Sequence, residues 1–116
     1  MIECNGKFLL ERLGYAHKKF TIPGGGVKKN ETLEDATRRE VFEEVGVRVG
    51  ELRKISEYFN TRQYKRDTVT VFYTKVENPE FKVDGIEVTE AGWFGLNELP
   101  EDRVPRVDKL LAMLTR

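Results

Sequence analysis

The sequence has few of the features that mark several large classes of protein. Cys4 is the only cysteine, so no disulfide can form within the chain, and its place beside an apolar segment favours a small buried thiol over a nucleophile. There is no long apolar run, and the N-terminus lacks the charged and then apolar pattern of a secretion signal. These absences favour a cytoplasmic protein that neither spans nor binds a membrane.

The chain also lacks an excess of charge of either sign. Its 20 Lys and Arg residues balance 20 Asp and Glu residues, so no overall field attracts a nucleic acid polymer or an anionic membrane surface. Any binding of phosphate must therefore be local. With 116 residues, no internal repeat and no dividing linker, we expect one domain over residues 1–116.

The most informative stretch runs from Gly24 to Val47 and reads GGGVKKNETLEDATRREVFEEVGV. Thr32 is a good N-cap, residues 33–45 contain neither Gly nor Pro, and Gly46 supplies a stop, so this stretch predicts a helix. At about 100° per residue, one side of that helix carries three acids. We call them the box glutamates: Glu40, Glu43 and Glu44.

Charge alone leaves two explanations of this acidic side open. A hard divalent cation such as Mg²⁺ or Mn²⁺ takes carboxylate oxygens as ligands and keeps positions for water and phosphate. Alternatively, the acids are only solvated and are offset by Arg38 and Arg39. The preceding glycine loop (Pro23–Gly26) favours the cation, because it lets a ligand approach the backbone and leads into a helix N-terminus that attracts phosphate.

The spacing of this stretch is specific. It reads Gly25, five residues, Glu31, seven residues, Arg39-Glu40-Val41, one residue, Glu43-Glu44, one residue, Gly46-Val47. This is the Nudix box, and the chain resembles the Nudix hydrolases. The resemblance covers nearly the whole chain, including the segments Gly6–Arg12, Phe20–Pro23 and Glu87–Pro100. It implies an α/β fold, the Nudix-type α/β/α sandwich with a mixed β-sheet between helices.

The resemblance also implies a function. The expected reaction is the hydrolysis of a nucleoside diphosphate linked to another moiety, with Mg²⁺ (or Mn²⁺) as cofactor. The expected substrate is a small nucleotide, such as an NDP-sugar, ADP-ribose or a non-standard (d)NTP, and not a nucleic acid polymer. The alternative is a non-catalytic Nudix-like sensor that binds a nucleotide, although such a module would need no cluster of carboxylates.

The match to the box assigns roles to individual residues. The metal ligands would be the carbonyl of Gly24 and the three box glutamates, Glu40, Glu43 and Glu44. Arg39 would orient a glutamate, and Glu31 would assist through water or at the helix start. The first candidate for the general base is Glu40, the second is Glu87 and the third is Glu90.

Substrate contacts are expected from Arg12, Gly25, Gly26 and Arg62. Substrate specificity is the property that the sequence predicts least well, because it depends on loops that the box does not define. The side chains to watch for it are His17, Tyr58, Arg62, Tyr64 and Trp93.

The remaining segments predict strands and a second helix. Residues 1–13 predict a hairpin, because Asn5-Gly6 is a strong two-residue turn signal. Segments 51–59 and 67–76 predict two paired strands, and 87–94 a later strand. A C-terminal helix is predicted from the spacing of Val107, Leu110, Leu111 and Leu114 after Pro105. Because the segment Met1–Cys4 could be a stunted edge strand whose neighbour a second copy covers, we expect a monomer or a homodimer.

Overall fold

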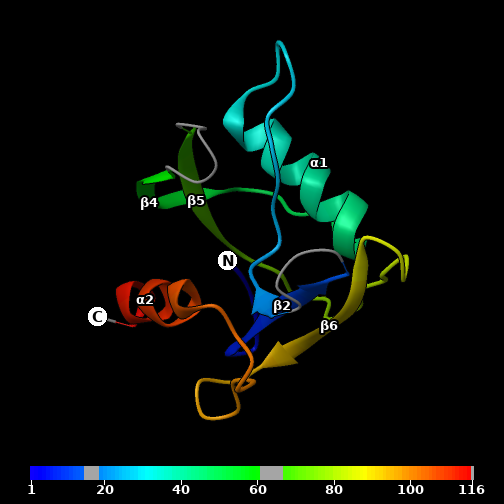
Figure 1. Ribbon diagram of the computed structural model, residues 1–116, viewed down its shortest axis with the longest axis vertical. Coiled ribbons are helices and arrows are strands. Elements are labelled where there is room, and N and C mark those ends of the chain that lie inside the picture. The colour runs from blue at the N-terminus through cyan, green and yellow to red at the C-terminus, as the bar shows by residue number, and fades with distance from the viewer. Residues whose placement is uncertain (15–18, 61–66, 116) are drawn as a thin grey trace.

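The computed structural model describes residues 1–14, 19–60 and 67–115. Its two helices, α1 (Leu33–Val45) and α2 (Pro105–Leu114), lie on either side of a β-sheet (Figure 1). The strands are β1 (Ile2–Cys4), β2 (Lys7–Leu13), β3 (Phe20–Thr21), β4 (Arg53–Asn60), β5 (Asp67–Lys75) and β6 (Val88–Phe94). Among these described residues, neither helix is both long and apolar enough to cross a bilayer.

The sheet is mixed, as predicted. Its strand order is β3-β2-β1-β5-β4, and β6 pairs with β2 on the side away from β1. The pair β1 and β5 is parallel, whereas β2 is antiparallel to its neighbours and β4 is antiparallel to β5. The predicted α/β sandwich with a mixed sheet is therefore confirmed.

The first hairpin forms at the predicted turn. Asn5 and Gly6 have φ angles of 51° and 82°, and two such left-handed residues are what a type I′ hairpin turn requires. The strand β1 is short, but it is not an edge strand, because it pairs with β2 on one side and with β5 on the other. The expectation of an uncovered edge beside Met1–Cys4 is therefore wrong. The oligomeric state itself stays a prediction.

Helix α1 begins and ends at the predicted residues because both caps form. The Thr32 side chain accepts a hydrogen bond from the backbone N–H of Asp35 at 3.1 Å, and Gly46 closes the helix with φ 67°. Just before it, Asn30 adopts φ 66°, a left-handed conformation that Asn tolerates better than most residues. These local signals place the box glutamates on the last two turns of α1.

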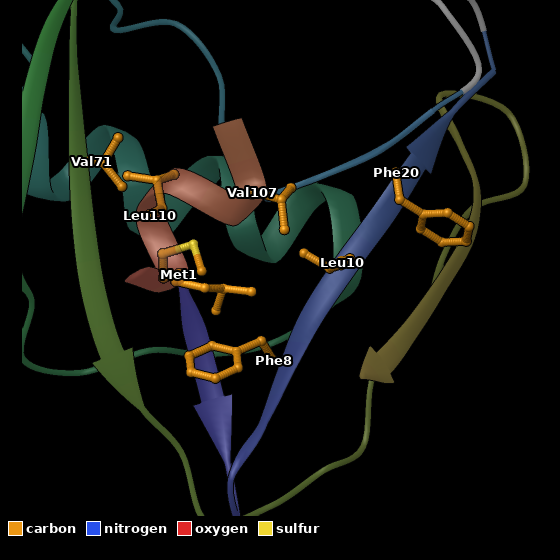
Figure 2. Close-up of a cluster of buried hydrophobic side chains, with 8 residues drawn as sticks. Met1, Phe8, Leu10, Phe20, Val71, Val107 and Leu110 are labelled. Carbon is orange, nitrogen blue, oxygen red and sulfur yellow. The ribbon is translucent and has the colours of Figure 1, made fainter. Parts of the chain in front are cut away.

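Two apolar layers follow from the alternation of side chains along β2. Phe8 and Leu10 face α2 and pack with Val107 and Leu110 (Figure 2). Leu9 faces α1 in a second cluster of buried side chains, which also contains Ile2, Val41, Val45 and Val47. Since the apolar side of α2 is buried inside the chain, it is not available to a second copy.

Candidate active site

Arg39 makes most of the charged contacts within the box. Its Nε and Nη2 donate to the carboxylate of Glu31 at 2.8 and 3.0 Å, and its Nη1 donates to Glu40 Oε1 at 2.7 Å. Nη1 also reaches Glu43 at 3.3 Å, and Nη2 donates to the carbonyl oxygen of Gly26 at 2.9 Å. The hydrogen bonds from Arg39 lower the pKa of Glu31 to about 2. These are the contacts that an orienting role for Arg39 requires.

The glycine loop lies directly against two of the box glutamates. The backbone N–H of Gly24 donates to Glu44 Oε1 at 3.1 Å, and Glu44 is buried. A Cβ atom at Gly25 would collide with the carboxylate of Glu40, so no larger residue fits there without moving that acid. The first glycine of the box is therefore explained by a close approach of backbone to carboxylate.

Glu11 of β2 joins this group, although the sequence analysis did not single it out. Its side chain is only 1% exposed, it shares a hydrogen bond with Glu44, and Glu40 lies close enough to repel its charge. Burial first, and then these neighbouring carboxylates, raise the pKa of Glu11, and burial also raises the pKa of Glu44. The feature of the sequence that could have identified Glu11 is its position two residues after Leu9, which places this acid on the same face of the strand as an apolar residue.

The donor chemistry of these acids fits a hard divalent cation. Within residues 1–14, 19–60 and 67–115, no three His, Cys, Asp or Glu side chains converge, as they stand, in a group that could hold a metal ion. Glu11, Glu40 and Glu44 nevertheless adjoin one another, Glu11 and Glu44 are buried, and Glu11 Oε1 has no hydrogen-bond partner among the described residues, whereas Glu43 is exposed. Buried carboxylates need a proton or a cation to offset their repulsion, and carboxylate oxygens are the ligands that Mg²⁺ and Mn²⁺ prefer.

A cavity of about 780 Å³ lies beside this group, between α1, the glycine loop and the strands β4 and β5. The three glycines of the loop line it, and Glu11 lies in its wall. Tyr58 lines another part, where the guanidinium of Arg106 stacks over the Tyr58 ring at 4.2 Å. Glu40 and Glu44 lie against the loop and near Glu11, but none of the three box glutamates is among the residues that line the cavity.

A family model described as NUDIX domain matches residues 1–114. The chain belongs to the Nudix family. The resemblance to the Nudix family that was seen in the box is thereby confirmed, and so is the prediction of a Nudix hydrolase at the level of the family.

Curated and solved relatives agree with this assignment. NAD-capped RNA hydrolase NudC of Citrobacter koseri is 35% identical over 80 residues, which are 69% of this chain and 30% of that protein. The chain thus spans about a third of the length of the curated relatives it matches. A MutT Nudix hydrolase from Burkholderia pseudomallei has a TM-score of 0.83 at 22% identity, covering 97% of this chain and 96% of that one. A Nudix hydrolase from Nitrosomonas europaea has a TM-score of 0.76 at 31% identity, covering 99% and 69%.

Not every residue suggested by the Nudix resemblance lies near the Nudix box. Arg12 Nη2 is 2.7 Å from Asp102 Oδ2, and Arg12 Nε is 3.3 Å from Glu90 Oε2. Because Glu11 and Arg12 are successive residues of β2, their side chains lie on opposite faces of the sheet. The structure therefore brings neither Arg12 nor Glu90 to the box glutamates.

The other predicted residues divide into three groups. Glu87 is exposed just before β6, where its carbonyl oxygen accepts a backbone hydrogen bond from Gly14. Trp93 is partly buried against the cluster around Leu9, and its Nε1 donates to the carbonyl oxygen of Pro79 at 2.7 Å, which is a structural role. The residues that lie outside the described part of the chain are His17, Arg62 and Tyr64.

Proposed function

We propose that this Nudix domain hydrolyses the pyrophosphate bond of a nucleoside diphosphate linked to another moiety, with Mg²⁺ or Mn²⁺ bound at the box glutamates. The observation that carries the proposal is the contact of two of these acids with the glycine loop. Glu44 accepts from the N–H of Gly24, and Glu40 lies where a Cβ of Gly25 would be. A phosphate chain in the cavity can approach this bare backbone, and so come close to a cation held by the acids.

Each residue of the box has a part in this proposal. The box glutamates and the Gly24 carbonyl would hold the cation, and Glu31 and Arg39 would support them. When bound, the cation would neutralise phosphate oxygens and lower the pKa of a water molecule. Arg39 keeps the carboxylates of Glu31 and Glu40 in fixed positions through three short hydrogen bonds, and a fourth ties it to the carbonyl oxygen of Gly26. Glu40 is preferred as general base over Glu87, because it lies within the acid group.

The cavity supports a small nucleotide as substrate. Tyr58 and the Arg106 guanidinium stacked on its ring bring an aromatic group and a positive charge to the same wall, which suits a nucleotide with its phosphates. The balanced net charge gives no general attraction for a polynucleotide. The name of the NudC relatives refers to NAD-capped RNA, so the dinucleotide end of such a cap belongs among the substrates to be tested.

The test is a panel of substrates incubated with the purified protein and Mg²⁺ or Mn²⁺. The panel contains ADP-ribose, NAD, NDP-sugars, dinucleoside polyphosphates, non-standard dNTPs and NAD-capped RNA. We expect divalent-dependent cleavage of at least one small nucleotide, abolished by excess EDTA. Nucleotide binding without cleavage of any member would instead support the sensor alternative, and preference for the capped RNA over free NAD would contradict the small-nucleotide proposal.

A further inference from the structure

Glu11 is a buried acid whose position the fold alone does not explain. It lies in the middle of β2, between the sheet and α1, in a layer that contains apolar side chains such as Leu9 and Val41. A carboxylate in such a layer costs free energy unless a cation, a donor or a proton satisfies it. An apolar residue would fill this place in the core with less penalty.

The groups next to Glu11 do not stabilise a negative charge on its carboxylate. Its Oε1 has no hydrogen-bond partner in the described part of the chain, and the side chains that act on its charge are the carboxyl groups of Glu44 and Glu40. Arg39, the cationic side chain that contacts the acids of the box, is engaged with Glu31, Glu40 and Glu43. Glu11 is also among the residues that line the cavity, together with the glycine loop.

We propose that Glu11 is an additional carboxylate ligand of the divalent cation, supplied by the sheet to complement the ligands supplied by the Nudix-box helix. The inference rests on the proposed function, because it concerns the cation that the proposed hydrolysis uses. With Glu11, acids from β2 and α1 meet from two sides, so the site is anchored to both layers. Glu44 of α1 contacts Glu11 and Glu40 and accepts from the Gly24 N–H, so the acids of the two elements meet at this side chain.

The rival explanation is that Glu11 is a protonated acid that only shares a hydrogen bond with Glu44. The two explanations differ in what the Glu11→Gln substitution does. Gln has the same shape and can donate to Glu44, so a structural hydrogen bond survives, whereas a carboxylate ligand is lost. Metal affinity therefore separates them, and folding of the metal-free protein checks that the variant is intact.

The experiment measures Mn²⁺ binding by titration calorimetry and by the loss of the free Mn²⁺ electron paramagnetic resonance signal, without any substrate. We expect Glu11→Gln to weaken Mn²⁺ binding at least about tenfold, the lower end of what loss of a supporting group costs a metal site. Its metal-free Tm should equal or exceed that of the wild type, because a buried acid has been removed. Glu98→Gln, the same change at an exposed position, should leave Mn²⁺ affinity unchanged.

The outcomes separate the two proposals. If wild-type protein binds Mn²⁺ and Glu44→Gln weakens binding while Glu11→Gln does not, the role of Glu11 is refuted and the proposed function stands. If the wild type binds no Mn²⁺ at millimolar concentration, the proposed function fails and the inference fails with it. Should Glu11→Gln not fold, Glu11→Met fills a similar volume without a polar group, and the same loss of affinity is expected from it.

Discussion

Replacing Glu44 by glutamine tests the centre of the proposed site. Glu44 is 8% exposed, accepts a hydrogen bond from Gly24 N at 3.1 Å and contacts the carboxyl groups of Glu11 and Glu40. Glutamine keeps the acceptor oxygen for the Gly24 N–H and offers an amide that can donate to Glu11. The change therefore removes one negative charge from the site and leaves its shape intact.

The expected effect on catalysis is large and the effect on folding is small. Removing one group that stabilises charge in a transition state lowers kcat by about 10²–10³-fold, or about 2.7–4 kcal/mol, and we expect a loss of at least about 10²-fold. The free energy of unfolding of the metal-free protein should stay within about 1 kcal/mol of the wild-type value, because a typical hydrogen bond of this kind contributes about that much. Loss of a buried like charge acts in the stabilising direction.

The assay compares kcat on the best substrate of the panel at saturating Mg²⁺, with urea unfolding of the metal-free protein beside it. Glu34→Gln is the matched control, because it makes the same change in the exposed first turn of α1 and should retain activity within about twofold, as surface substitutions usually do. A folded Glu44→Gln protein with near-wild-type kcat would refute the assignment of Glu44 as a ligand. An unfolded variant would refute the argument that glutamine preserves the local contacts.

Three further predictions concern other parts of the structure. Gly25→Ala should lower kcat by about 10²-fold with unchanged circular dichroism, because the new Cβ displaces the Glu40 carboxylate; wild-type kcat would contradict this. Leu110→Ala should reduce the free energy of unfolding, measured in urea, by about 2–5 kcal/mol, because Leu110 is 2% exposed in the core. A loss below about 1 kcal/mol would contradict this, because it would mean that neighbouring side chains fill the space left by Leu110. The hydrogen bonds from Arg39, and then the one from the Lys28 N–H, lower the pKa of Glu31 from 4.5 to about 2, so their stabilisation is complete above pH 4.5 and is lost as the pH falls towards 2. The Tm difference between wild type and Glu31→Gln should shrink over that window, and a constant difference would refute the link.

Much of the site could be predicted from the sequence because its signals are local. The caps at Thr32 and Gly46 define α1, and the geometry of a helix then places Glu40, Glu43 and Glu44 on one side without any knowledge of the sheet. The turn at Asn5-Gly6 is of the same kind, since its two residues specify the hairpin by themselves. Each of these depends on interactions between residues a few positions apart.

The contribution of β2 was different, because it depends on which face of the sheet meets α1. The run Phe8-Leu9-Leu10 is apolar at every position, so its pattern does not say which alternate residues face which helix. Only the tertiary structure shows that Glu11 faces α1 and the acids, while Arg12 faces Asp102 and Glu90 on the other side. This is why the sequence analysis did not single out Glu11, and the role of Arg12 as a substrate contact stays a prediction.

The position of β1 in the sheet is a second feature that local sequence signals did not predict. Its shortness was evident from the sequence and suggested an exposed edge, but a strand of three residues can equally lie between two longer ones. Its parallel pairing with β5 joins residues that are far apart in the sequence, and no local signal encodes that partner. The sequence by itself determined the helix, its acids and the turns through contacts between near neighbours. The strand order and the meeting of Glu11 with Glu44 were decided by the tertiary structure, because they arise only when distant segments bury their apolar faces together.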